Sequence, residues 1–192
     1  MKATKKTGRC SWPGTDELMT EYHDREWGTP LHDDDKLFEF LILDGFQAGL
    51  SWKTILYKRE NFRKAFDGFD ARKIARYKEK KLERLLQDAG IIRNRLKISG
   101  TVANARAFLE TQAEFGSFDK YIWQFTGFKT MVTKRKPGEA AAATSPESDA
   151  MSKDMRKRGF KFVGSTICYA FMQAAGMVND HAVNCFRYKE CR

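Results

Sequence analysis

Residues 82–97 read LERLLQDAGIIRNRLK, and this stretch predicts two helices joined by a tight turn. Leu82, Leu85 and Leu86 recur at helical spacing. Gly90 marks the end of the first helix, because glycine is the usual residue just beyond a helix C-terminus. A second apolar series with the same spacing begins shortly afterwards. The segment is therefore a candidate helix-turn-helix hairpin.

This hairpin has features that favour phosphate binding. Gly90 has no Cβ, so a partner can approach its backbone closely, and the start of the next helix offers unpaired N–H groups. Arg93, Arg95 and Lys97 add three cations. A second basic cluster, residues 156–161, contains a phenylalanine. The alternative for both segments is an ordinary helix corner or helix end with a solvated basic face.

The rest of the chain also has helical periodicity, and no stretch alternates cleanly between apolar and polar residues. We therefore predict an all-α fold in which capping residues precede most helices. These are Asp33-Asp34-Asp35, before a helix that runs up to Gly45, and Ser51, Asp70, Ser117, Ser148 and Ser165.

The domain organisation is predicted to be simple. The chain of 192 residues is long enough for one domain with a packed core. Residues 129–148, which include KRKPG and an alanine run, break the helical pattern and are expected to form a mobile loop. Aromatic segments on both sides of this loop predict two helical lobes that share one core over residues 1–192.

Composition narrows the compartment and the partners. The formal net charge is +10, which favours a polyanionic partner, although a protein can be basic without binding one. No apolar run is long enough for a membrane span, so no membrane partner is expected. Four cysteines do not suggest a disulfide framework in a chain of this length. They predict a reduced, cytoplasmic compartment, where Cys and His residues often hold metal.

Cysteine and histidine residues lie near both chain ends. His181 and Cys185 are four residues apart, so on a helix they would project from one face. Together with Cys10 and His23 they would complete a closed Cys2His2 zinc shell. The alternative is that they are unrelated core residues. The H-x-E and P-C-x-x-C strings of base deaminases and the H-E-x-x-H string of metalloproteases are absent from the sequence, so a zinc ion here would be structural.

Six strings resemble the 3-methyladenine DNA glycosylase I family, within the helix-hairpin-helix glycosylase superfamily. They keep their order and span nearly the whole chain. They are CSW at residues 10–12, EYHDREWG at 21–28, QAGLSW at 47–52, QDAGIIR at 87–93, KRGFKFVG at 157–164 and VNDH at 178–181.

The resemblance implies a helix-hairpin-helix glycosylase fold whose N- and C-terminal segments are joined by one structural zinc per chain. The implied ligands are Cys10, His23, His181 and Cys185. The implied partner is double-stranded DNA with an alkylated base, bound by a monomer. The positions that match the family's phosphate contacts are Gly90, Ile92, Arg93 and Lys161.

The resemblance also implies a base pocket built from Trp12, Tyr22 and Trp52, with Leu50 nearby. Asp44 takes the position at which the family has a glutamate, so the carboxyl is one methylene shorter. The alternatives are that the tryptophans fill the core and that Asp44 is a solvated residue at a helix end. The implied reaction is hydrolysis of the N-glycosidic bond of 3-methyladenine after base flipping, with Asp44 as the catalytic carboxyl.

Other functions remain as alternatives. The lysine nucleophile of bifunctional superfamily members has no evident counterpart at the hairpin, so no strand-cutting lyase activity is expected. A non-catalytic hairpin module that binds damaged DNA would need neither the carboxyl nor the aromatic residues. An RNA-binding zinc protein is a third reading, but the sequence has no RNP-type aromatic string.

Overall fold

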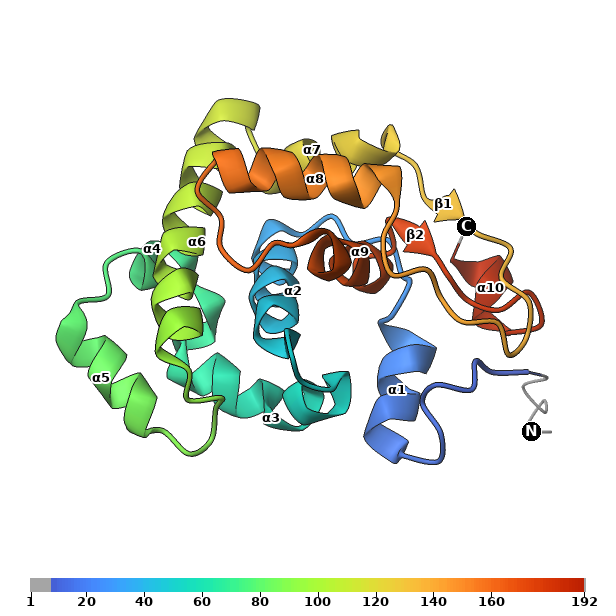
Figure 1. Cartoon of the computed structure of the whole chain (residues 1–192), viewed down its shortest axis with the longest axis horizontal. Coiled ribbons are helices and arrows are strands. Elements are labelled where there is room, and N and C mark those ends of the chain that lie inside the picture. Colours follow the sequence, from blue (N-terminus) through green and yellow to red (C-terminus); the bar gives the residue numbers. More distant parts are fainter. Residues whose placement is uncertain (1–7, 192) are drawn as a thin grey trace.

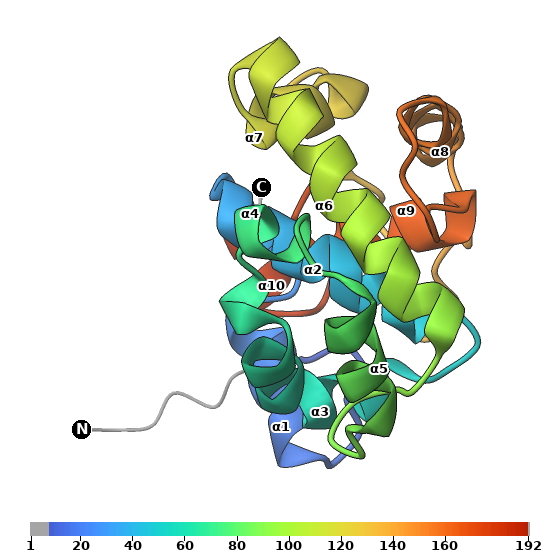
Figure 2. The same cartoon turned by 90° about the vertical axis from the view of Figure 1, so that its left-hand side faces the viewer.

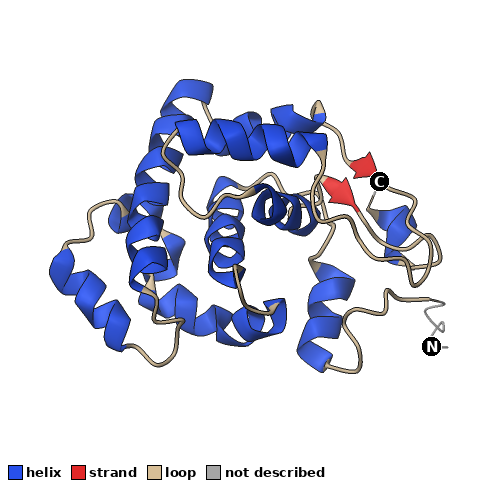
Figure 3. Ribbon diagram, viewed as in Figure 1, coloured by secondary structure: helices blue, strands red, loops and turns tan. Residues whose placement is uncertain are grey.

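The computed structural model describes residues 8–191, and helices dominate this part of the chain (Figures 1 and 3). The predicted all-α class is confirmed. Residues 1–7 of the predicted single domain lie outside the described residues. The helices and strands are α1 (Glu17–Arg25), α2 (Asp34–Gln47), α3 (Trp52–Ala65), η1 (Asp67–Phe69), α4 (Ala71–Ile74), α5 (Glu79–Gln87), α6 (Arg95–Phe115), α7 (Phe118–Trp123), η2 (Gln124–Thr126), β1 (Met131–Val132), α8 (Pro146–Lys157), α9 (Ser165–Ala174), β2 (Val178–Asn179) and α10 (Arg187–Glu190).

Helix α2 is the central element of the fold. It packs against α3, α6, α7 and α9, which surround it in Figure 1. Every residue from Leu37 to Phe46 is buried, as expected for a helix covered on all sides. The prediction that this helix ends at Gly45 is wrong, because the helix continues to Gln47. Gly45 lies within the helix next to Phe162, and a Cβ at this position would make an ordinary contact of 3.5 Å with the Phe162 Cβ.

The predicted helix caps are partly correct. Ser148 does not cap α8, because this helix begins one turn earlier, after Ser145. The Ser145 side chain accepts from the Ser148 N–H, and the Ser148 hydroxyl accepts from the Ser145 N–H, which forms a capping box. Ser165 is the first residue of α9, which has no side-chain cap. The caps confirmed are Asp33, Ser51, Asp70 and Ser117.

The predicted hairpin is formed by α5 and α6 (Figure 2). The two helices pack against each other, and residues 88–94 make the turn between them. Asn94 caps α6, because its side chain accepts from the Lys97 N–H at 3.1 Å. Asp88 stabilises the turn by accepting from the Gly90 N–H at 2.7 Å.

Strands β1 and β2 pair in parallel over two residues each. Sequence periodicity did not predict these strands. Two residues are too few to show an alternating pattern. These strands bring the start of the predicted loop, residues 129–148, against the chain that follows α9 (Figure 3). The last three residues of that predicted loop, 146–148, belong to α8 instead. The mobility of the segment stays a prediction.

One hydrophobic core contains residues from α1 to β2. A second, small cluster contains Cys10, Ala182 and Cys185, and Trp12 and Trp27 pack against both clusters. The two ends of the described chain therefore meet beside the core, as Figure 1 shows. Within residues 8–191, no helix is long and apolar enough to cross a membrane.

Candidate active site and metal centre

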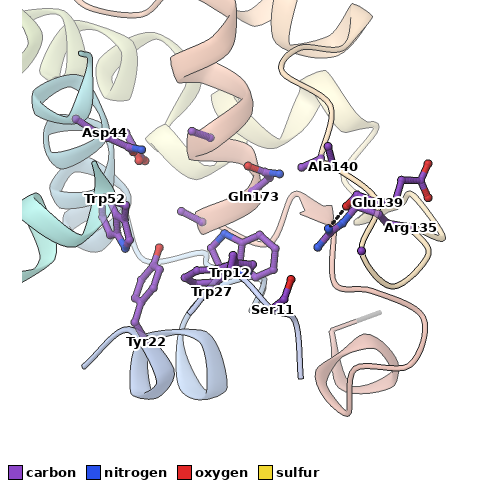
Figure 4. Close-up of a pocket in the computed structure, with 15 residues that line it drawn as sticks. Ser11, Trp12, Tyr22, Trp27, Asp44, Trp52, Arg135, Glu139, Ala140 and Gln173 are labelled. Carbon is purple, nitrogen blue, oxygen red and sulfur yellow. Dashed lines mark hydrogen bonds between the residues drawn. The ribbon is translucent and has the colours of Figure 1, made fainter. Parts of the chain in front are cut away.

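A cavity of about 430 Å³ opens between α1, α2, α9 and the segment that follows β1 (Figure 4). Four aromatic side chains and one buried carboxyl dominate its wall, an arrangement typical of a pocket for a small ligand. The side chains that define it are Trp12, Tyr22, Trp27, Asp44 and Trp52, and the wall is completed by Ser11, Gln47, Arg135, Gly138, Glu139, Ala140, Ala141, Ala170, Gln173 and Ala174.

Asp44 is placed in this wall by α2, the helix that is buried on all sides. Only 2% of the residue is exposed, and its Oδ2 atom has no hydrogen-bond partner. Burial raises the pKa of Asp44 well above its ordinary value, and the positive charge of Arg59 opposes this shift. The alternative that Asp44 is a solvated residue at a helix end is therefore wrong.

The aromatic residues form a continuous wall beside Asp44. The Tyr22 and Trp52 rings lie 5.1 Å apart with an interplanar angle of 41°, and the Trp12 ring meets Tyr22 at 6.3 Å. Burial, and the nearby carboxyl of Asp44, raise the pKa of Tyr22 well above its ordinary value. The Tyr22 hydroxyl therefore stays protonated and can donate a hydrogen bond into the cavity.

Three polar atoms of this wall lack partners. Among the described residues, the Nε1 atoms of Trp12 and Trp52 and the Oδ2 atom of Asp44 are buried without a hydrogen bond. An unsatisfied buried polar atom costs about 1 to 3 kcal/mol, and such atoms in native structures often face a ligand or water. A flat ligand with both donors and acceptors at its edge would pair these atoms and stack on the rings.

The sequence-based set and the observed wall differ at several positions. Leu50 lies in the turn between α2 and α3, is 42% exposed and does not line the cavity. Trp27, Gln173 and the segment from Arg135 to Ala141 line it but were not expected there. Trp27 lies within the EYHDREWG string, which was a signal for it. The other two had no motif.

The four expected metal ligands meet in one buried group. Their ligand atoms lie within 4.8 Å of one another, and the group could hold a metal ion. Cys10 Sγ lies 3.7 Å from His181 Nδ1, and Cys185 Sγ lies 3.5 Å from His23 Nε2 and 3.6 Å from His181 Nδ1. Sulfur and nitrogen ligands around a tetrahedral zinc are about 3.6 Å apart, given bond lengths of about 2.3 and 2.05 Å. The residues therefore fit zinc.

Neighbouring groups orient the rings of both histidines. His23 Nδ1 donates to Asp24 Oδ1 at 2.8 Å, and His181 Nε2 donates to the Trp27 carbonyl at 3.1 Å. Because each acceptor fixes the proton on that nitrogen, the other ring nitrogen presents its lone pair to the group. Cys10 Sγ accepts from the Ala182 N–H at 3.4 Å.

The expectation that His181 and Cys185 lie on a helix is wrong. Residues 180–182 are irregular, residues 183–186 form a turn, and α10 begins only at Arg187. The Cys185 N–H donates to the Ala182 carbonyl at 2.7 Å, so a turn brings the two ligands together. His32, the remaining histidine, lies elsewhere and contacts Asp119 Oδ1 at 2.7 Å.

The hairpin cations differ in their surroundings. Arg93 and Lys161 are exposed, and Gly90 and Ile92 lie in the hairpin turn. Arg95 pairs with Glu79 at 3.1 Å. Lys97 is not a phosphate-facing cation, which corrects the sequence-based expectation: it is 7% exposed, and its Nζ donates to the carbonyls of Phe46 and Ala48 at 2.8 and 2.6 Å. Burial lowers the pKa of Lys97.

The fold and the site together define a helix-hairpin-helix protein with an aromatic pocket built around a buried carboxyl. Comparison with known proteins gives the family. Residues 12–188 match the model of the family described as methyladenine glycosylase, and the chain belongs to this family. The resemblance inferred from the six strings is confirmed, and so is the prediction that the chain is an enzyme of this kind.

Individual relatives match over nearly the whole chain. The chain is 50% identical to DNA-3-methyladenine glycosylase 1 of Escherichia coli over 94% of its own length and 96% of the relative. A crystal structure of a 3-methyladenine DNA glycosylase I superposes with a TM-score of 0.91 at 49% identity, covering 93% of this chain and 98% of the other. The Staphylococcus aureus enzyme, solved to explain its recognition of 3-methyladenine, gives 0.90 at 32% identity, with 94% and 96% covered.

Proposed function

We propose that the protein is a base-excision repair glycosylase that removes 3-methyladenine from alkylated double-stranded DNA. The observation that carries this proposal is the unpaired carboxyl of Asp44 in a cavity walled by Trp12, Tyr22 and Trp52. Family membership and the relatives named for this base support the same substrate.

The proposed first step is extrusion of the methylated nucleotide from the helix. A base inside the duplex cannot reach a cavity in the protein, so the nucleotide must rotate out of the stack. The rings of Trp12, Tyr22 and Trp52 replace the stacking that is lost. A base methylated at N3 carries a positive charge in the nucleotide, and contact with an aromatic face then adds about 0.5 to 2 kcal/mol.

The carboxyl of Asp44 is proposed to select this cation. Without a cation in the cavity, burial favours the protonated acid. A cationic base beside Asp44 favours the carboxylate instead, so the site binds the methylated base better than neutral adenine. The Tyr22 hydroxyl and the indole N–H groups of Trp12 and Trp52 are proposed to donate hydrogen bonds to the base edge.

The bond that breaks is the N-glycosidic bond of the methylated nucleotide. Its electron pair moves to the base, which leaves as neutral 3-methyladenine. Water supplies the hydroxyl that C1′ gains and releases its remaining proton to the solvent. Because the base leaves as a neutral molecule, it needs little protonation, and orientation with charge complementarity supplies most of the rate. No lysine lines the cavity among residues 8–191, which supports a monofunctional hydrolase without lyase activity.

The hairpin is proposed to anchor the DNA backbone. The N-terminus of α6 carries the positive end of a 21-residue helix, and the exposed Arg93 lies just before it. The turn residues Gly90 and Ile92 offer backbone groups, and the exposed Lys161 is the further proposed contact. Leu50, at the turn before Trp52, is proposed to contact the DNA beside the flipped base.

One structural zinc is proposed to join the two chain ends, held by Cys10, His23, His181 and Cys185. All four positions are taken by side chains, so the ion would stabilise the fold and leave no position for substrate. The protein is proposed to act as a cytoplasmic monomer.

Incubation of the purified protein with methylated duplex DNA tests the proposed function. The expected product is free 3-methyladenine, detected by chromatography, together with abasic sites in DNA whose strands stay intact. Strand cleavage without added base or heat would contradict the monofunctional mechanism. Recovery of no free methylated base would overturn the proposed function.

A further inference from the structure

Gln173 has no role in the proposed chemistry, but its side chain lines the cavity. It lies on α9, opposite the α2 wall that carries Asp44. In Figure 4 its carbonyl oxygen faces the side of the cavity where Asp44 lies, and its nitrogen faces away. The backbone of Gln173 is also held, because its carbonyl accepts from the Gly28 N–H at 3.1 Å.

The orientation of the Gln173 amide follows from its partner. Its Nε2 atom donates to Asp180 Oδ2 at 2.6 Å. Asp180 is 1% exposed, and its other oxygen accepts from the Thr133 hydroxyl at 2.6 Å. A carboxylate can only accept hydrogen bonds, so the amide must direct its NH2 group to Asp180. The carbonyl oxygen of Gln173 is then directed away from Asp180.

We propose that Gln173 is a specificity-determining residue, whose carbonyl accepts a hydrogen bond from the exocyclic amino group of the bound base, and that Asp180 is the residue that positions it. This inference rests on the proposed function. An amino group has two hydrogens, and the Gln173 carbonyl is proposed to accept one of them.

This arrangement selects among methylated purines. Adenine carries an amino donor at position 6, where guanine carries an oxygen acceptor. When 3-methylguanine enters the cavity, the fixed carbonyl of Gln173 would face that oxygen. Both atoms are acceptors, so no hydrogen bond can form between them. A site that hydrogen-bonds its substrate rejects the analogue that lacks the matching group, because the buried polar atom is left unpaired. The enzyme should therefore release 3-methyladenine faster than 3-methylguanine.

The test is the ratio of single-turnover release rates of 3-methyladenine and 3-methylguanine from the same methylated duplex DNA. Gln173→Met keeps the length and helix propensity of the side chain but removes its acceptor. It should lower the ratio about tenfold, by slowing release of 3-methyladenine. Asp180→Asn should also lower the ratio, because an asparagine can donate to the Gln173 carbonyl and allow the amide to turn its NH2 toward the cavity.

Gln112 provides a matched control. Its Nε2 atom donates to Asp34 Oδ2 at 2.6 Å, the same kind of pair, and it does not line the cavity. Gln112→Met should leave the ratio at the wild-type value. Thermal unfolding identifies which variants fold. Binding of the two free bases, followed by tryptophan fluorescence, gives the ratio of their affinities and so measures the same preference without catalysis.

The outcomes separate the inference from the proposed function. Loss of preference in each of the two variants that folds as the wild type does, with Gln112→Met unchanged, supports the role of Gln173. An unchanged ratio in whichever of the two variants folds as the wild type does, while the wild type still releases 3-methyladenine, overturns this inference alone. A wild-type protein that releases neither base overturns the proposed function itself.

Discussion

Cys10 Sγ lies 3.7 Å from His181 Nδ1, although 171 positions separate the two residues in the sequence. This contact brings the two ends of the described chain together beside the cavity. Trp12 follows Cys10 by two residues, and Tyr22 directly precedes the candidate ligand His23. The metal group and the aromatic pocket therefore share two short segments of chain, and loss of one is expected to disturb the other.

The first prediction concerns the metal group. Cys185→Ala should abolish zinc binding and lower the thermal unfolding midpoint by at least about 5 °C, since structural zinc contributes directly to folding free energy. Metal analysis and calorimetry measure the two effects. Cys168→Ala is the matched control, because this thiol is buried outside the group and its loss should leave one zinc per chain. Absence of zinc from wild-type protein never exposed to chelator would contradict the proposal.

Arg93 should contribute to binding of any duplex. Arg93→Ala removes an exposed cation before α6, so affinity should fall equally for damaged and undamaged DNA. The slope of log K against log salt should become shallower by about 0.9, the value for one phosphate contact. Binding titrations at several salt concentrations measure this. Arg72→Ala, which removes an exposed arginine of α4, serves as the control. Equal slopes for wild type and Arg93→Ala would place Arg93 away from the phosphates.

Lys97 should affect stability instead of salt dependence. Its ammonium group donates to two carbonyls at the end of α2, so Lys97→Met leaves both without this donor. The free energy of unfolding should fall by about 1 to 3 kcal/mol, while the salt slope of DNA binding stays at the wild-type value. Urea unfolding and the same titrations measure both quantities. A slope reduced as in Arg93→Ala would show that Lys97 does reach phosphate.

These contacts show which features sequence reasoning could find. Helix starts at Asp33, Ser51 and Ser117 were predicted because a cap depends on neighbours a few residues away. The four candidate metal ligands do lie together in one group, although the turn at Cys185 was expected to be helical. A spacing of four residues between His181 and Cys185 is compatible with a helix and with a turn, so the spacing could not show which of the two forms.

Other features depend on contacts between distant segments. The sequence gives no basis for separating the three hairpin cations Arg93, Arg95 and Lys97. Lys97 differs only in the folded protein, because the C-terminus of α2 lies against its ammonium group. Gln173 is an isolated amide in an apolar helix, with no motif around it. Its importance comes from Asp180, which approaches it after the chain turns back at the end of α9.

Burial of Asp44 predicts a specific dependence of stability on pH. Because burial raises its pKa, the folded state keeps a proton that the unfolded carboxyl loses above its ordinary pKa of 3.8. The folded state binds more protons, so stability should fall as pH rises above that value. The asparagine of the Asp44→Asn variant cannot ionise, so the stability of this variant should not fall with pH in this way. Its unfolding midpoint should exceed that of the wild type by a few degrees at about pH 8 and match it near about pH 4. Parallel pH profiles would contradict the buried, protonated carboxyl.

The proposed function depends above all on the charge of Asp44, and single-turnover excision of 3-methyladenine from methylated duplex DNA tests this role most directly. Asp44→Asn keeps the volume of the side chain and removes the charge that favours the cationic base, whereas Asp44→Glu keeps the charge and lengthens the reach. Excision by Asp44→Asn should slow by about ten- to a thousandfold, with binding to undamaged duplex near the wild-type value, and Asp44→Glu should recover most of the loss. Excision by folded Asp44→Asn protein at the wild-type rate would contradict the role of this carboxyl.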